Sequence, residues 1–357
     1  MKFATLIILL LLASAPAAAQ PGRGPEPRPV PRPAPAGADA LERSTPADPS
    51  AVVSLCLASG DVVVRGWDRA EVRASAGGGG GLELRTDRGQ PARRVEVLVS
   101  QGADLPARPG ECGVTDGLEL NVPRGAAVSL RVQEGDVAVS DVAELTVNNM
   151  SGDVEVRGIA RGVEVRTMSG DVSLSDSKGR VRLRVVSGSV LASNLAPLSP
   201  TDVFDASSTS GDVELEGVRH SRVSGATISG SVRMTGPLAP GGTYEFKSVS
   251  GDVTLALPSD SSFRLDAKVV MSGEIVTDFP VRTSSLTPED EADPPAPPTS
   301  PAPPAPPAGQ GHPRPGPRVN VPPPPPMRPT RLVGTVGAGD AAVDLSSFSG
   351  TLHLKKQ

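Results

Sequence analysis

The sequence predicts an all-β fold, a β-solenoid or β-roll in which short strands repeat about every 18–23 residues. Three observations support this prediction. A short Ser-Gly phrase returns at nearly constant spacing through residues 150–275. Between its copies, apolar and charged residues alternate, as in Val163-Glu164-Val165-Arg166, which is the pattern of a half-buried strand. Aromatic residues make up only 2% of the chain, which suits a narrow interior filled by Val and Leu.

The repeated phrase is a mostly apolar residue, then Ser-Gly, then Asp, Ser or Glu, then Val or Ile. It occurs at residues 150–154, 168–172, 186–190, 209–213, 228–232, 249–253 and 271–275, with looser copies at 59–62, 134–137 and 349–352. A repeat of this length indicates one supersecondary unit stacked on itself. No window shows the 3.6-residue period of an amphipathic helix.

The glycine and the acidic residue of each copy are assigned to a turn. Glycine takes a positive φ without steric cost, and a short polar side chain after it bonds to the local backbone. The predicted turn residues are Gly60, Asp61, Gly135, Asp136, Gly152, Asp153, Gly170, Asp171, Gly188, Gly211, Asp212, Gly230, Gly251, Asp252, Gly273 and Gly350.

A calcium ladder is the alternative role for the acidic residues. Calcium-binding β-rolls repeat Gly-Gly-x-Gly-x-Asp and share each ion between turns. This chain has one acidic residue per turn, and Ser189 and Ser231 replace it in two copies. The sequence therefore favours turn chemistry, and it predicts no metal and no cofactor.

Residues 1–19 have the features of a secretory signal peptide. An apolar run at residues 3–13 is too short to be a good membrane span, and the small residues 17–19 precede the expected cleavage between Ala19 and Gln20. The alternative is an uncleaved anchor. No Cys follows the leader for lipid attachment, and no second segment is apolar enough to span a bilayer. We expect a soluble mature protein that is periplasmic or secreted.

Proline marks two linkers around the repeats. Residues 20–50 are rich in Pro and Ala and are expected to be a disordered linker. Of the 39 prolines, 19 lie between residues 288 and 329, so residues 288–330 are expected to be a disordered insertion. The solenoid domain is expected at 51–287, with irregular first coils or a cap at 51–146. A strand pattern resumes at 331–357, where we expect the chain to complete the solenoid.

Two cysteines, Cys56 and Cys112, lie in the first third of the chain. In an oxidising compartment they could form a disulfide. The alternative is two independent thiols. Neither has a catalytic His or the spacing of a metal site nearby.

No catalytic constellation is evident in the sequence, and we predict that the protein is not an enzyme. The chain lacks Gly-x-Ser-x-Gly, His-Glu-x-x-His and a Walker loop. Trp67 and Tyr244 are interpreted as packed or rim residues. Carboxylates and arginines alternate along the strands, as at Glu164 and Arg166, and are interpreted as a solvated sheet face. The three histidines are interpreted as solvated residues: His220, His312 and His353.

Three stretches resemble the bacterial putative-adhesin domain, a domain of unknown function. They are the segment Val52–Asp68, the strand Leu118–Pro123 and the Ser-Gly-Asp-Val series. The closing segment 334–354 also looks like the terminal unit of that family. The resemblance covers most of 51–279 and 331–355. It implies a right-handed β-solenoid in the bacterial cell envelope, with no established activity.

We therefore expect a non-enzymatic, exported envelope protein that acts as a scaffold or an adhesin-like binding surface. Its expected partner is a cell-envelope or surface component, and its oligomeric state is left open. Lys plus Arg number 35 against 40 for Asp plus Glu, so no basic stripe predicts nucleic-acid binding. Two alternatives remain: a carbohydrate-active β-helix enzyme, and a periplasmic sensor or regulatory partner of a membrane protein.

Overall fold

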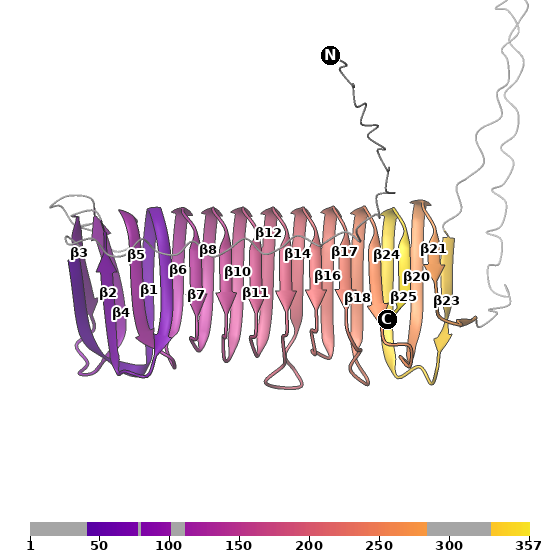
Figure 1. The fold of residues 1–357 in the computed structure, drawn as a ribbon, viewed down its shortest axis with the longest axis horizontal. Helices are drawn as coiled ribbons and strands as arrows, with labels where there is room; N and C mark the ends of the chain where they lie inside the picture. The colour runs from indigo at the N-terminus through magenta and orange to yellow at the C-terminus, as the bar shows by residue number, and fades with distance from the viewer. Residues whose placement is uncertain (1–40, 78–79, 101–110, 284–329) are drawn as a thin grey trace, which may run out of the picture. The chain divides into compact units, whose positions relative to one another are not determined.

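The protein is described by a computed structural model that covers residues 41–77, 80–100, 111–283 and 330–357. This part of the chain forms 25 β-strands and contains no helix (Figure 1). The all-β solenoid predicted from the repeats is confirmed. The signal peptide 1–19 and most of the proline-rich segments lie outside the described residues.

Each coil of the solenoid contains one long and one short strand. In the coil of β10 (Gly162–Ser169) and β11 (Val172–Ser175), the Ser-Gly corner separates the two. Alternate residues of β10 are buried, so Val163 and Val165 point inward while Glu164 points outward. The strict alternation of apolar and charged residues therefore places Val163 and Val165 on the inner face.

The coils stack in register and form two ladders of parallel strands. The long strands are β6 (Ala127–Glu134), β8 (Glu144–Ser151), β10, β12 (Arg180–Ser187), β14 (Phe204–Ser210), β16 (Arg222–Ser229) and β18 (Thr243–Ser250). The short strands are β7 (Val137–Ser140), β9 (Val154–Arg157), β11, β13 (Val190–Ser193), β15 (Val213–Glu216), β17 (Val232–Thr235) and β19 (Val253–Leu257). Like residues stack on like residues, as when Val163 pairs with Val181 and Leu145.

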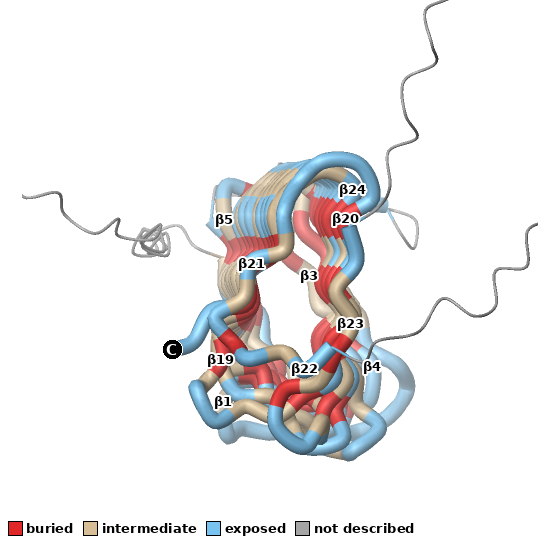
Figure 2. The backbone as a smooth tube through the Cα atoms, turned by 90° about the vertical axis from the view of Figure 1, so that its right-hand side faces the viewer, coloured by how far each residue is buried: buried red, intermediate tan, exposed pale blue. Residues whose placement is uncertain are grey.

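The core is a set of aliphatic columns that face the interior of the coils. Figure 2 views the tube along the stack, where buried positions of successive coils lie behind one another. Four aromatic residues are also fully buried: Phe204, Tyr244, Phe246 and Phe263. Each large apolar side chain moved out of water contributes about 1.5–3 kcal/mol, so the stabilisation is spread evenly along the stack.

The first third forms both early coils and a cap. β1 (Leu41–Trp67) is one long strand, and its residues 52–59 pair with β6 while residues 62–65 pair with β7. On its other side β1 lies parallel to β4 (Ala92–Ser100) and β5 (Gly113–Pro123). The antiparallel strands β2 (Glu71–Ala76) and β3 (Gly81–Thr86) close this end.

The linker boundary predicted at residue 50 is wrong. Residues 41–50 are part of β1, and residues 41–46 pair antiparallel with β2. Pro46 and Pro49 made this stretch look like a linker, but both prolines are accommodated within β1. Residues 20–40 lie outside the described part of the chain.

The last strands return to the solenoid, but not in chain order. The coil of β18 and β19 is followed in sequence by β20 (Phe263–Ser272), β21 (Ile275–Thr277) and β22 (Arg282–Thr283). After residues 284–329 come β23 (Thr330–Val336), β24 (Ala341–Ser349) and β25 (Leu352–Lys356). β24 lies between β18 and β20, and β25 lies between β19 and β21 (Figure 1). The final coil therefore occupies the second-to-last place in the stack.

Candidate functional site

The predicted glycine corners form one column along the stack. Every predicted corner glycine has a positive φ, for example +121° at Gly170 and +142° at Gly188. The Gly170 N–H donates to Ser187 O at 3.0 Å, and this bond recurs from coil to coil. A Cβ added to Gly188 would lie 2.1 Å from Gly170 O. Both the φ and the close approach of the next coil therefore require glycine.

The predicted aspartates act as hydrogen-bond acceptors between turns. Asp153 Oδ1 accepts the backbone N–H of Asp171 at 2.9 Å, and Asp171 Oδ1 accepts that of Ser189 at 2.8 Å. The same bond occurs between four further pairs of turns: Asp61 to Asp136, Asp136 to Asp153, Asp212 to Ser231 and Asp252 to Thr351. At Ser189 the hydroxyl replaces the carboxylate and accepts the Asp212 N–H at 3.3 Å. Each carboxylate thus satisfies one turn amide of its neighbour.

A buried polar column beneath the corner was missed by the sequence reasoning. Ser208, Thr227 and Ser248 are nearly inaccessible, and their hydroxyls donate to the carbonyls of Gly188, Gly211 and Gly230 at 2.8–3.0 Å. Asn149 donates to Gly152 O at 2.8 Å from the same position. The available signal was a polar residue two places before the corner serine, on the face that the alternation makes internal.

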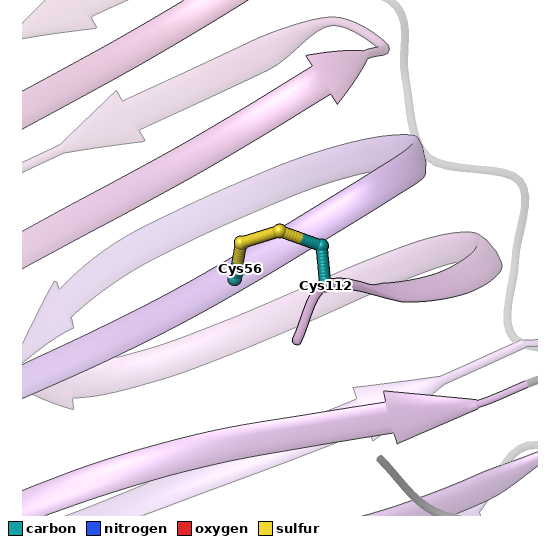
Figure 3. Close-up of a disulfide and its surroundings, with 2 residues drawn as sticks. All are labelled: Cys56 and Cys112. Carbon is teal, nitrogen blue, oxygen red and sulfur yellow. A yellow bond between two sulfur atoms is a disulfide. The ribbon is translucent and has the colours of Figure 1, made fainter. Parts of the chain in front are cut away.

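Cys56 and Cys112 form a disulfide across the first coils (Figure 3). Their Cα atoms lie 4.5 Å apart, and 56 positions separate them in sequence. Cys56 belongs to β1, and Cys112 precedes β5 directly. The disulfide therefore links β1 to the residue directly before β5, the strand that pairs with β1.

The interpretation of His220 as a solvated residue is wrong. Its side chain is fully buried, and its Nε2–H donates to Gly179 O at 2.7 Å, while Nδ1 has no partner. Burial lowers the pKa of His220. Tyr244 is buried beside it and donates to His220 O at 3.2 Å. His353 is half-buried in β25, and His312 lies outside the described residues.

Trp67 lies at the rim of the first coils. Its Nε1–H donates to Glu71 O at 2.8 Å. The guanidinium groups of Arg69 and Arg73 lie 4.9 Å and 5.2 Å from its ring centroid. The two cations cover the ring, so Trp67 serves packing and does not offer a bare platform for a sugar.

An exposed apolar column runs along the outer edge of the long-strand ladder. One residue stands directly before the corner serine in each coil, and neighbouring serines pair in register. The apolar column consists of Met150, Met168, Val186, Ile228, Val249, Phe348 and Met271, with Thr209 in the β14 position. Its apolar members are 43–55% exposed and follow one another at the strand spacing of about 4.8 Å.

Charged columns lie on both sides of the apolar column. On the sheet side, a partly basic column contains Arg131, Arg166, Arg184, Lys247 and Lys268, which the strand register aligns. Its other positions are uncharged: Asn148, Ser207, Ala226 and Ser346. On the corner side stand the aspartates of the turn ladder, such as Asp153 and Asp171. The result is an apolar strip between a cationic edge and an anionic edge.

The described residues contain no group of three or more His, Cys, Asp or Glu placed to hold a metal ion. A shallow hollow of about 310 Å³ lies at the first corner, beside Asp61, Thr115 and Glu134.

The outer carboxylates form exposed ion pairs, as Glu164 does with Arg166 and Glu245 with Lys247. The described residues contain no helix that could span a membrane.

Comparison with known proteins gives one family and three similar structures. No curated protein matches the chain. A putative cell adhesion protein from Clostridium sporogenes matches 89% of this chain over 100% of its own, with 9% identity and a TM-score of 0.23. A putative adhesin from Parabacteroides distasonis matches 61% over 90%, with 9% identity and a TM-score of 0.40.

The third similar structure is a putative adhesin from Parabacteroides merdae, with 11% identity, a TM-score of 0.31 and coverage of 62% of this chain and 91% of that one. The family model described as Toastrack DUF4097 matches residues 113–290, which span the regular coils from β5 through β22. The chain therefore carries a Toastrack DUF4097 domain, a domain of unknown function.

Proposed function

We propose that this protein is an exported, non-enzymatic scaffold of the bacterial cell envelope, and that the apolar column is its binding surface. The observation that supports this most directly is the row of seven exposed Met, Val, Ile and Phe side chains along eight successive coils, with Thr209 in the remaining coil. Contiguous exposed apolar strips on soluble domains mark interaction sites. The leader at residues 1–19 supports export.

The fold makes this surface rigid before any partner binds. The strands that carry Met150, Met168, Val186, Ile228, Val249 and Phe348 each lie between two parallel strands, and the corner bonds from glycine N–H to serine O link the coils. A preorganised surface loses little conformational entropy on association, so a larger part of the contact energy appears as affinity. The strip therefore suits an elongated partner that lies along the stack.

The flanking charges restrict the chemistry of that partner. The basic column on one side and the aspartates on the other favour a ligand with an apolar centre and edges of opposite charge. The aspartates on one edge would repel a uniformly anionic partner. An envelope protein or peptide segment with mixed charge fits the strip better.

The enzymatic alternative has no specific support among the described residues. The outer carboxylates Glu164 and Glu245 are paired with Arg166 and Lys247 on the same strands. Such exposed pairs contribute at most about 1 kcal/mol and discourage edge association. The sensor alternative depends on residues 288–330, which lie almost entirely outside the described chain.

Binding of the purified mature protein to envelope fractions tests the proposal. We expect the wild type to sediment with one fraction, and the triple variant Met150→Ser, Met168→Ser, Ile228→Ser to bind at least about tenfold more weakly. A matched control replaces three exposed apolar residues outside the column: Val52→Ser, Leu198→Ser and Val276→Ser. This control should bind like the wild type.

Two results would contradict the proposal. One is equal binding by the wild type and the column variant, and the other is no binding of the wild type to any envelope fraction. Turnover of any member of a polysaccharide panel, with or without calcium, would contradict the non-enzymatic part.

A further inference from the structure

The last segment of the chain fills a slot between two coils that precede it in sequence. β24 pairs with β18 on one side, where Tyr244 aligns with Val343, and with β20 on the other, where Leu265 aligns with Val343. β25 is likewise placed between β19 and β21. The glycine column passes through this coil without a break, because Gly251 N donates to Ser349 O and Gly350 N to Ser272 O.

The same segment also encloses β20 from its other side. β23 pairs antiparallel with β20, so β20 lies between β23 and β24. The loop between them crosses Ser262, whose Oγ accepts the N–H groups of Ala338 and Gly339 at 2.9 Å. Arg331 adds a bidentate pair with Asp266, at 3.0 Å and 2.6 Å. We call residues 330–357 the C-terminal clamp.

The solenoid is incomplete without the C-terminal clamp. Its removal would leave β18 and β19 facing β20 and β21 across an empty slot with four open strand edges, and would uncover the edges of β20 and β22 that pair with β23. Val343, Leu345, Leu352 and Leu354 of the clamp are buried in the core columns. A few strands of this size cannot bury those residues alone, so the clamp is stable only within a slot.

The two ends of the stack differ in how firmly the inserted coil is tied. β1 is also an inserted coil, but only residues 68–70 connect it to β2, and the disulfide Cys56–Cys112 fastens it to the next coil. The clamp has no disulfide, and residues 284–329 separate it from β22. A connection of that length could span more than about 100 Å if extended.

We propose that the C-terminal clamp is exchanged between copies, so that the clamp of one molecule completes the solenoid of a second. Every contact of the clamp is the same in the closed monomer and in the exchanged dimer. The balance therefore depends on the effective concentration that the connection imposes, which is millimolar for short flexible tethers and falls as the tether lengthens. Dilute folding gives closed monomers, and crowded folding gives linked copies. This inference does not depend on the binding surface proposed above.

The first test uses the full-length, oxidised wild-type protein. After unfolding in denaturant without reductant, the protein is refolded at about 1 μM and at about 500 μM, and its mass is measured by size-exclusion chromatography with light scattering. We expect monomer from the dilute sample and at least a tenfold larger dimer fraction from the concentrated one. Monomer alone at both concentrations would overturn the proposal.

The second test locates the exchanged element. Lys247 in β18 and Ser346 in β24 are register partners on the outer face. The single variants Lys247→Cys and Ser346→Cys are refolded together at high concentration, oxidised, and analysed by intact mass. We expect a covalent heterodimer, because adjacent positions in a parallel pair are within disulfide range. The same variants refolded separately and then mixed should give little heterodimer.

The control applies the same design to the inserted coil at the other end. Arg65 in β1 and Ser140 in β7 are register partners. The pair Arg65→Cys and Ser140→Cys should give no heterodimer after refolding together, because β1 is held by its short connection and its disulfide. Equal cross-linking at both ends would mean general association and would overturn clamp exchange. Absence of heterodimer at Lys247 and Ser346 would do the same.

Discussion

At the scale of single residues, the corner glycines are required twice, by conformation and by space. Gly188 has a φ of +142°, and an added Cβ would approach Gly170 O to 2.1 Å. The neighbouring atom is backbone within a hydrogen-bonded ladder, so it cannot move aside without breaking the corner bonds. The Ser-Gly phrase therefore repeats because each coil approaches the previous one at the same atom.

We predict that Gly188→Ala lowers the free energy of unfolding by about 3 kcal/mol or more, since strain and overlap act together. Gly162→Ala is the matched control, because its φ is not positive and its nearest neighbour, Arg180 O, lies 3.4 Å from the added Cβ. The control should change stability by less than about 1 kcal/mol. Urea titration followed by circular dichroism measures both, and equal losses would contradict the explanation.

We predict that His220 makes the stability of the regular coils depend on pH. Its folded pKa is lowered by burial, while the unfolded chain titrates near the ordinary value of about 6.5. The unfolded state therefore binds the proton first, and stability falls as the pH drops below about 6.5. We expect His220→Gln, which can still donate to Gly179 O, to remove most of this loss. Unfolding free energies at pH 7.5 and pH 5 provide the measurement, and an unchanged difference would count against His220.

At the scale of elements, the inserted strand β24 brings like charges together. Asp344 aligns with Glu245 of β18 and with Asp266 of β20. Partial desolvation is the main cause that raises the pKa of Asp344, and the two neighbouring carboxylates raise it further. Lys247 and Arg331 lower this pKa, but by less. The folded state therefore disfavours the charged form of Asp344 at neutral pH.

We predict that Asp344→Asn stabilises the protein at pH 7 by a few tenths of a kcal/mol up to about 1 kcal/mol. Because the folded pKa is the higher one, the wild type regains this energy as the pH falls through it, so the gain should shrink in acid. Thermal unfolding at pH 7 and pH 4 tests the prediction. Thr254→Val, on β19, is a control that changes no charge, and a gain that grows in acid would refute the account.

Element boundaries also show where sequence patterns stop being sufficient. Residues 41–50 contain Pro46 and Pro49 and resemble a linker, yet they are strand because β2 pairs with residues 41–46. His220 follows β15 in a connection between strands, where a polar residue is usually exposed. It is buried because the coils on either side cover it. In both cases the deciding contacts come from other strands.

At the scale of the whole molecule, the disulfide Cys56–Cys112 constrains the end of the stack that contains β1. A cross-link that closes a loop of this length reduces the entropy of the unfolded chain by the equivalent of about 4 kcal/mol. We predict that the double variant Cys56→Ser, Cys112→Ser loses stability by up to that amount. Denaturant titration with and without reductant checks this, because the wild type should respond to reductant and the variant should not.

This prediction requires that Cys56 and Cys112 are oxidised to a disulfide in the wild-type protein. Two free thiols per chain in the unreduced wild type, counted by a thiol reagent under denaturing conditions, would contradict the disulfide. If the double variant is as stable as the unreduced wild type, the disulfide does not contribute to the free energy of unfolding.

The sequence by itself determined the coil. Alternation decided which residues face inward, and the glycine-and-aspartate phrase decided where each coil turns, because both depend on neighbours within about 20 residues. Only the tertiary structure decided the order of the coils and the position of the apolar column on their outer edge. Coils with nearly identical faces pair almost equally well, so local patterns cannot specify which coil lies beside which. The closure of the two ends, by β1 and by the C-terminal clamp, makes that choice.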